Sequence, residues 1–382
     1  MFQTIQNAFK TKEVRMKLLY VLFALIVVRI GCNIPIPGVN GSVMQEMFNN
    51  NKSLGFLDVM TGGSFSRMSI FALNITPYIT ASIILQLLTI AIPRLEELQK
   101  DGEDGRKKIN EYTRYLSIVL AVIEGLAMVI GFRNQNIFKE SGYVSMIVAV
   151  VSLTAGAAFL MWLGEQITVK GVGNGISIIL LINIVARIPS DLAGLYNTYI
   201  KGASNITNAL IAGVIIVAVI VAMYVFIVFL QDGERRIPVQ YAKRIVGNKQ
   251  YGGARQYIPL KVNAAGVMPI IFAQAIMFIP ITFIGFSNVD HVSGFVRAFT
   301  DHTSFWYNFV FAIMIILFTY FYTAITINPT QMAEDMKRNN GFIPGIKPGK
   351  KTAEYIDDIM SRITLPGSFF LALVAIMPAF AG

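Results

Sequence analysis

Few residues in this chain of 382 could carry chemistry. It has one cysteine, Cys32, and two histidines, His291 and His302, which share a polar loop with no HExxH or carboxylate spacing around them. A single cysteine excludes a disulfide framework and a cysteine metal site. Paired aspartates and Ser with His are absent from the apolar segments, and the phosphate-binding pattern GxxxxGK[ST] is absent from the chain. We therefore predict no catalytic residue, no metal site and no cofactor.

Two charged residues lie inside apolar segments, Arg29 and Glu124. A charge at the centre of a bilayer costs about 3 kcal/mol on insertion scales, so each side chain should face protein, pair with another group or reach an interface. We favour a structural role for both residues over a proton or ion relay.

The composition defines the class of protein. Hydrophobic residues make up 54% of the chain and charged residues 14%, and the mean hydropathy is +0.59. These values exclude an ordinary soluble domain and indicate a polytopic membrane protein whose spans are helical. Nine apolar runs are long enough to be predicted as spans, the fifth of them short and expected to be tilted: 18–36, 70–92, 115–132, 144–163, 176–188, 209–230, 264–285, 305–327 and 365–381.

Lysine and arginine are distributed unevenly between the two sides of these spans. With the amino terminus in the cytoplasm, 24 of the 32 fall on the cytoplasmic side and 7 on the opposite side, with Arg29 inside a span. The positive-inside rule therefore predicts a cytoplasmic amino terminus. Residues 1–17 form a basic, weakly amphipathic cytoplasmic arm, and the first span is retained because no small-residue cleavage site follows it.

Residues 57–68 lie directly before the second span and are too short to cross a membrane. Their sequence, LDVMTGGSFSRM, is typical of a short, half-buried helix broken by Gly62 and Gly63. Non-spanning backbone at membrane depth is tolerated only where protein or a water-filled cavity surrounds it. The segment is therefore predicted to stop a cavity inside the helical bundle.

Two cytoplasmic segments are longer than turns. Residues 231–263 have a period-two pattern and a glycine turn, which predicts two strands, and their net charge is +5. Residues 328–364 contain a helix started by Thr352, with one apolar face. That face comprises Tyr355, Ile356, Ile359 and Met360. The first lobe has the charge to approach phosphate or an acidic protein, although such charge also serves only topology.

Seven runs spread along the chain resemble the SecY/Sec61-alpha family, the channel subunits of protein-translocation machinery. They are RIGCNIPIPGVN (29–40), ALNITPYITASIILQLL (72–88), DGRKKINEYTRY (104–115), FLMWLGEQITVKGVGNGISI (159–178), ERRIPVQYAKR (234–244), PLKVNAAGVMP (259–269) and FIPGIKPGKKTAEYID (342–357).

The resemblance implies an all-α membrane protein with two pseudo-symmetric halves, related by an inverted repeat, around an hourglass pore with a short plug helix. The halves would be residues 18–192 and residues 193–382, the second with cytoplasmic lobes 231–263 and 328–364. An apolar pore ring would resist ions, because it offers no replacement for their hydration shells. The implied ring residues are Ile75, Ile79, Leu180 and Ile271, and the implied plug residues are Leu57, Met60, Gly62, Gly63, Ser64, Phe65 and Arg67.

The resemblance also implies a lateral gate through which signal and transmembrane helices pass into the lipid. Its polar residues would be Gln86, Asn263 and Gln274. Implied partners are SecE and SecG, the SecA ATPase, the ribosome, signal peptides with unfolded preproteins, and membrane lipids. The cytoplasmic lobes would bind the ribosome and SecA through Arg235, Arg236, Lys243, Arg244 and Lys347. Lys347 stands where bacterial relatives commonly have arginine, so a bidentate contact there would be lost.

The expected function is a protein-conducting channel of the bacterial plasma membrane, and not an enzyme. The family has ten spans, whereas nine are predicted before Gly382, so the tenth is expected to be absent. A secondary transporter built on an inverted repeat is the alternative. It should show ionisable residues near the midplane of broken helices, and Glu124 is the one candidate.

Overall fold

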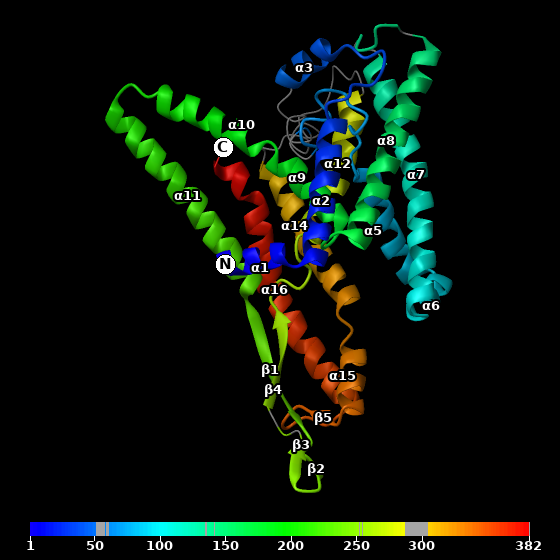
Figure 1. The fold of residues 1–382 in the computed structure, drawn as a ribbon, viewed down its shortest axis with the longest axis vertical. Coiled ribbons are helices and arrows are strands. Elements are labelled where there is room, and N and C mark those ends of the chain that lie inside the picture. The colour runs from blue at the N-terminus through cyan, green and yellow to red at the C-terminus, as the bar shows by residue number, and fades with distance from the viewer. Residues whose placement is uncertain are drawn as a thin grey trace. The chain divides into compact units, whose positions relative to one another are not determined.

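The computed structural model describes residues 1–50, 58, 61–133, 136–140, 142–251, 253, 255–286 and 305–381. Most of these residues are helical, as the sequence predicts for a polytopic membrane protein (Figure 1). The chain divides into two compact units: Met1–Ala203 with Ile281–Asp290, and Ser204–Pro280 with His291–Gly382. We call them the first and second unit. The predicted division at residues 192 and 193 stays a prediction.

The first unit is built mainly from the helices of residues 1–201. They are α1 (Phe2–Lys10), α2 (Lys12–Gly31), α3 (Gly41–Asn50), α5 (Thr76–Ala91), α6 (Pro93–Lys100), α7 (Glu103–Arg133), α8 (Tyr143–Lys170), α9 (Gly175–Val185), α10 (Ile188–Leu195) and the π-helix η1 (Tyr196–Lys201). Helix α7 packs against α5 and α8, and α8 in turn packs against α2 and α9. Apolar faces along these long helices must be buried against one another, which gives the unit its layers.

Helix α5 begins later than the predicted span. Residues 70–75 are turns, and Asn74 has a φ of 52°, a left-handed conformation that a helix cannot continue through. Pro77 then stands in the first turn, where its missing N–H costs nothing. At the other end Ile92 is extended before Pro93, and α5 and α6 meet at an angle of 102°.

The second unit combines helices with a small sheet. Its elements are α11 (Ile206–Asp232), β1 (Glu234–Tyr241), β2 (Arg244–Val246), β3 (Lys249–Tyr251), β4 (Arg255–Lys261), α12 (Met268–Phe286) as far as Pro280, α14 (Phe305–Thr326), α15 (Pro329–Arg338), β5 (Gly341–Phe342) and α16 (Lys350–Ala381). Strands β1 and β4 pair antiparallel, from Glu234 opposite Lys261 to Gln240 opposite Arg255. The two strands predicted in residues 231–263 are confirmed, and β2 and β3 form a further short hairpin.

Strand β5 joins the two predicted lobes into one structure. It pairs with β1 through Gln240 opposite Phe342 and Tyr241 opposite Gly341, which gives the strand order β4-β1-β5. Below the sheet lies an apolar cluster shared by β1, β4, α15 and α16: Ile237, Val239, Leu260, Met336, Ile343, Ile356, Ile359 and Met360. The predicted apolar face of residues 355–360 is confirmed, since Ile356 is fully buried and Tyr355 packs against the cluster.

Six helical stretches in the described residues are long and apolar enough to cross a membrane. They are 103–133, 143–170, 175–201, 206–232, 305–338 and 350–377, and the bent pair α5 and α6 would be a seventh. The first and seventh of the nine predicted spans have no such stretch. Helix α2 is 20 residues long but carries charges near both ends, and the apolar helix described at Met268–Met277 is short.

Candidate functional site

The described residues of the predicted plug segment, residues 57–68, belong to the first unit. We call its described part, Asp58 and residues 61–68, the plug segment. Asp58 is helical and residues 61–68 form turns, in keeping with the predicted break at Gly62 and Gly63, which have φ values of 68° and 86°; Met68 has a φ of 50°. Gly62, Gly63, Ser64 and Phe65 are buried and Arg67 is exposed. Leu57 and Met60 lie outside the described residues.

Main-chain hydrogen bonds fix the end of the plug segment. The amide of Ile36 donates to the carbonyl of Met68 at 3.0 Å, and the amide of Ile70 donates to the carbonyl of Ile34 at 3.1 Å. Pro35 and Ser69 form an antiparallel bridge between these bonds. The loop that follows α2 therefore holds the point at which the plug segment joins the second predicted span. Arg67 adds a side-chain hydrogen bond to Asn33.

Apolar contacts anchor the second half of the plug segment. Phe65 is 5% exposed and Met68 is fully buried, and both belong to a core cluster with Phe132 of α7 and Leu153 of α8. The Phe65 ring lies 5.2 Å from that of Phe48 in an edge-to-face arrangement, which aromatic pairs favour. This half is thus part of the core of the first unit.

Polar contacts hold the first half. The Arg187 guanidinium, which follows α9, lies 2.7 Å from Oδ2 of Asp58, and Arg29 of α2 donates to the Gly62 carbonyl at 3.1 Å. Asp58 Oδ1 also accepts the amide of Ser66 at 2.8 Å. From the sequence, Arg29 was predicted only to be a charged residue inside a span. Neither Asp58 nor Arg187 was predicted as a site residue. The signal for Arg29 was its position, since a charge at membrane depth needs a partner.

A buried polar pair lies behind the plug segment. Asn183 of α9, 1% exposed, donates its amide to Oδ1 of Asn74 at 3.2 Å, and Cys32 Sγ lies 3.9 Å from Asn183 Oδ1. A Cβ on Gly62 would come within 3.0 Å of the Asn183 carbonyl oxygen. Buried amides are stable only when paired, so the residues that the plug segment rests on have a fixed geometry.

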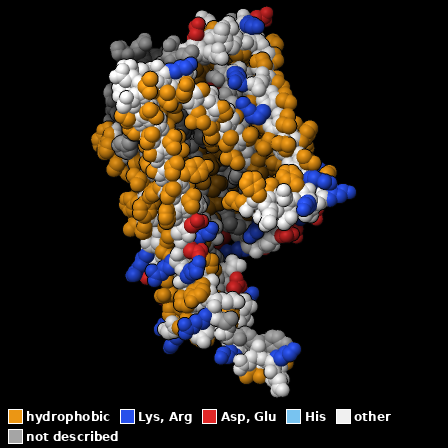
Figure 2. Space-filling model, turned by 60° about the vertical axis from the view of Figure 1, so that its left-hand side comes forward, with side chains coloured by type: hydrophobic (Ala, Val, Ile, Leu, Met, Phe, Trp, Pro, Cys, Tyr) orange, Lys and Arg blue, Asp and Glu red, His pale blue; other side chains and the backbone are white. Residues whose placement is uncertain are grey.

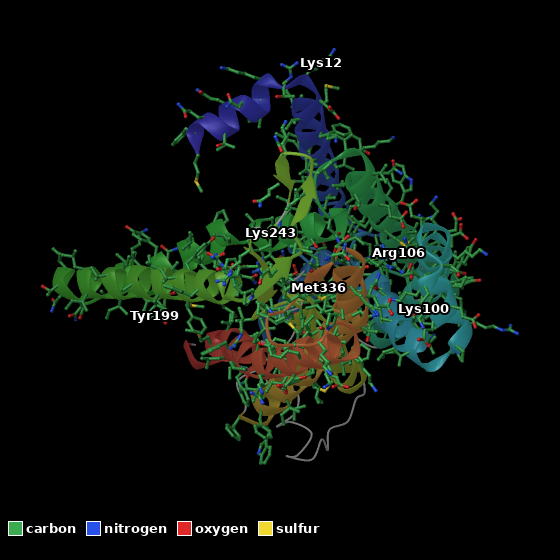
Figure 3. The ribbon with its side chains drawn as sticks, turned by 90° about the horizontal axis from the view of Figure 1, so that it is seen from below. Lys12, Lys100, Arg106, Tyr199, Lys243 and Met336 are labelled. Carbon is green, nitrogen blue, oxygen red and sulfur yellow. The ribbon has the colours of Figure 1, made fainter. Side chains whose placement is uncertain are left out.

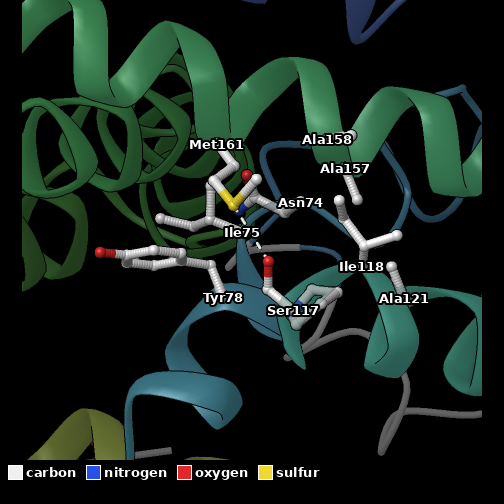
Figure 4. A pocket seen from close by; sticks show the side chains of 10 residues that line it. Asn74, Ile75, Tyr78, Ser117, Ile118, Ala121, Ala157, Ala158 and Met161 are labelled. Atoms are coloured by element: carbon white, nitrogen blue, oxygen red, sulfur yellow. Dashed lines mark hydrogen bonds between the residues drawn. The ribbon is translucent and has the colours of Figure 1, made fainter. Parts of the chain in front are cut away.

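Three of the four predicted ring residues come together in the first unit. Ile75 is 1% exposed, and Ile79 and Leu180 are half-buried beside it in a cluster with Val28 and Leu160. Ile75 also lines a cavity of about 10 Å³ between α5, α7 and α8, which is large enough for about one water molecule (Figure 4). At the wall of this cavity the Ser117 hydroxyl donates a hydrogen bond to the Met161 sulfur at 3.0 Å. Ile271, the fourth predicted residue, is half-buried on α12 of the second unit.

The predicted gate residues are divided between the units. Gln86 lies half-buried on α5 of the first unit, whereas Asn263 and Gln274 belong to the second. Asn263 is 4% exposed, and neither polar atom of its side chain has a hydrogen-bond partner among the described residues. The Oε1 atom of Gln86 is likewise buried and unpartnered within the described part of the chain.

The predicted cytoplasmic residues lie on the surface of the second unit. Arg235, Arg236, Lys243 and Lys347 are exposed, and the side chain of Arg244 lies outside the described residues. Figure 3 labels Lys243, which lies between β1 and β2, and Met336, which lies on α15. Arg236 is already bonded to Glu234 at 2.9 Å. Figure 2 shows lysine and arginine side chains over the end of the molecule that carries the strands, and hydrophobic side chains over the long helices.

Glu124 is half-buried on α7, and both histidines lie outside the described residues. No group of three or more His, Cys, Asp or Glu side chains that could hold a metal ion occurs in the described ranges.

Known proteins were compared with this chain by sequence and by structure. The SecY family model matches residues 69–382. The protein translocase subunit SecY of Halalkalibacterium halodurans is 48% identical over 390 aligned residues, which cover 100% of this chain and 89% of the relative.

Solved structures share the fold. A SecY structure, described with the statement that the SecY plug domain stabilises the closed state of the translocation channel and maintains a membrane seal, superposes with a TM-score of 0.67 at 19% identity, covering 96% of this chain and 86% of that chain. Sec61 in the canine ribosome-channel complex superposes with a TM-score of 0.56 at 16% identity, covering 96% and 90%.

Proposed function

The chain belongs to the SecY family of protein translocase subunits and is a protein-conducting membrane channel rather than an enzyme, and we propose that its plug segment and apolar ring form the closed seal of that channel. The observation that carries the seal is the burial of non-helical chain among helices of spanning length. Gly62, Ser64 and Phe65 are buried next to α2, α7 and α9. Such backbone is tolerated only inside protein or beside a cavity.

The apolar ring completes the seal in this proposal. Ile79 and Leu180 border the cluster that contains Ile75, and Ile271 of the second unit would contribute from the other half. Aliphatic side chains replace none of an ion's hydration shell and make no specific contact with a passing peptide. The ring would therefore block ions while accepting unfolded preproteins of any sequence.

Ionic conductance in planar bilayers tests the seal. The purified translocase containing the full chain should be tight, and the same complex with residues 57–68 deleted should leak ions. A matched deletion of equal length in the exposed strand tip, residues 243–254, should stay tight because it leaves the plug segment intact. If the complex that lacks residues 57–68 is folded and inserted and is as tight to ions as the parent, the proposed seal is refuted.

The lateral gate is the second part of the proposal. A buried asparagine without a hydrogen-bond partner is costly, so Asn263 is expected to find its partner across the gate in the closed channel, together with Gln86 and Gln274. Asn263→Leu should then let weaker signal sequences open the channel. Gln256→Leu, on the exposed surface of β4, is the matched control. Unchanged signal-sequence stringency in Asn263→Leu would rule the gate contact out.

The exposed basic residues of the second unit are proposed to dock partners on the cytoplasmic side. Arg235, Lys243, Arg244 and Lys347 would contact ribosomal RNA or SecA, and SecE and SecG would complete the complex in the bacterial plasma membrane. The fold neighbour bound to a ribosome supports this placement. Binding through phosphate contacts must weaken as salt increases, so ribosome affinity measured against salt concentration tests it. The amino terminus would lie in the cytoplasm, as the distribution of charges predicts.

A further inference from the structure

The first half of the plug segment has one strong ionic contact outside itself. Nη1 of Arg187 lies 2.7 Å from Oδ2 of Asp58, across 129 residues of sequence. The Asp58 side chain is 11% exposed and that of Arg187 is 31% exposed. A charge-assisted hydrogen bond of this length between partly buried groups is stronger than an exposed surface pair.

Asp58 also organises the turn that carries it. Its Oδ1 accepts the Ser66 amide at 2.8 Å, and its main-chain carbonyl accepts the Gly63 amide at 2.9 Å. Oδ1 of Asp58 therefore accepts a hydrogen bond from within the plug segment, and Oδ2 accepts one from Arg187. Loss of Arg187 would remove the ionic contact outside the plug segment and leave the bonds from Ser66 and Gly63 to Asp58 in place, whereas Asp58→Asn would keep an acceptor for Ser66 and lose only the charge.

A second arginine acts on the same half. Arg29 Nη1 donates to the Gly62 carbonyl at 3.1 Å, and Gly62 lies so close that an added Cβ would be 2.7 Å from that nitrogen. Arg29 belongs to α2 and Arg187 is the N-cap of α10, so two separate helices contact this half of the segment. Phe65 and Met68, in contrast, are fixed in the apolar core.

These contacts differ in how easily they can be exchanged for water. The Arg187 side chain already reaches solvent, so both charges of its pair can be hydrated when they separate. Moving Phe65 and Met68 would expose apolar surface with no such compensation. The first half can therefore leave its place at a lower cost than the second, with Gly62 and Gly63 between them.

We propose that Arg187 and Asp58 are positioning residues that bias the plug segment toward its closed place, and that separation of this ion pair is the step that frees the first half of the segment. This rests on the proposed function of the plug segment as a seal. The pair would set how often the channel opens without substrate. Arg29 would support it through the Gly62 carbonyl.

A double-mutant cycle tests the pair. Ionic conductance would be recorded in planar bilayers from the purified translocase with the full chain, carrying Arg187→Gln, Asp58→Asn, or both. Each single variant should open about tenfold more often than the parent, the change expected for one charge-assisted hydrogen bond. The double variant should open no more often than either single one, because the same contact is lost.

Two further variants separate charge from structure. Arg187→Lys keeps the charge and should restore most of the tightness. Arg114→Gln is the matched control, because Arg114 makes an interhelical pair with Glu165, also at 2.7 Å, that does not involve the plug segment. It should leave the conductance unchanged.

The outcomes distinguish this proposal from the seal itself. If deletion of residues 57–68 leaks but Arg187→Gln is as tight as the parent, the seal stands and the role of the pair is refuted. Additive opening in the double variant, or Arg187→Lys opening as often as Arg187→Gln, would also overturn it. If the deletion is tight, the seal and the pair both fail.

Discussion

The plug segment of the first unit and the sheet of the second unit both interrupt a helical protein, yet different contacts hold them. The first half of the plug segment depends on two arginines and on glycine turns. The sheet depends on strand pairing and on an apolar cluster beneath it. Polar contacts can be replaced by water one at a time, whereas an apolar core is lost as a whole. The segment proposed to move is therefore the one held by polar contacts that water can replace.

The largest effect is expected in the core beneath the sheet. Ile356→Ala removes a fully buried side chain shared by α16 and the sheet and should destabilise the second unit by about 2–5 kcal/mol. Limited proteolysis of the strands against temperature would measure it. Asp357→Ala, exposed on the next position of α16, is the control and should change little. Equal resistance in both variants would mean that the cluster does not hold the sheet.

A smaller effect is expected at the glycine turn. Gly62→Ala and Gly63→Ala both force alanine into a left-handed conformation, at about 1–2 kcal/mol each. A Cβ on Gly62 would also lie 2.7 Å from Nη1 of Arg29 and 3.0 Å from the Asn183 carbonyl oxygen. The nearest atom to a Cβ on Gly63 is 3.7 Å away. The overpacking should add about 1–3 kcal/mol at Gly62. Bilayer conductance should therefore rise more in Gly62→Ala, and equal leakage would contradict the close contact.

The buried amides behind the plug segment should matter less. Asn183→Ala removes the donor to Asn74 and should lower the stability of the first unit by about 1 kcal/mol, the net value of one hydrogen bond. Melting temperatures of Asn183→Ala, Asn74→Ala and the double variant would show the coupling. Non-additive losses are expected, and strictly additive ones would show that the two side chains act independently.

The smallest effect on stability is expected on the surface of the sheet. Lys243→Ala and Arg236→Ala should each change the free energy of unfolding by less than about 0.5 kcal/mol, because both side chains are exposed. They should differ in ribosome binding. Arg236 is engaged by Glu234, so its loss should cost less affinity than the loss of Lys243. A titration at two salt concentrations measures this, and the reverse order would contradict the proposed docking surface.

Local sequence patterns predicted much of the fold. Continuous apolar runs identified most of the spanning helices, and period-two alternation identified β1 and β4. The helical face of Tyr355, Ile356, Ile359 and Met360 was also predicted, because side chains at this spacing must share a face whatever they contact. The family was named from seven runs that keep their order along the chain, and the comparisons bear it out.

The candidate site was only partly predictable. Its plug and ring residues came from resemblance, since isoleucine and leucine at helical spacing occur throughout such a chain. The early start of the second span was wrong, because residues 70–75 are turns and Asn74 adopts left-handed backbone, as do Gly62, Gly63 and Met68 before it. A glycine pair signals a break, but the conformations of Met68 and Asn74 depend on what packs around them.

The sequence by itself determined the membrane class, most of the helices that are long and apolar enough to cross a membrane, the uneven distribution of charge and the family. Each of these follows from local composition and spacing. Only the tertiary structure decided that Arg187 meets Asp58, that Arg29 meets the Gly62 carbonyl, and that β5 joins β1. These contacts link residues 33 or 129 positions apart, or strands with two predicted spans between them, and no periodicity connects such positions. They form because buried charges and backbone groups must find partners wherever the fold brings them together.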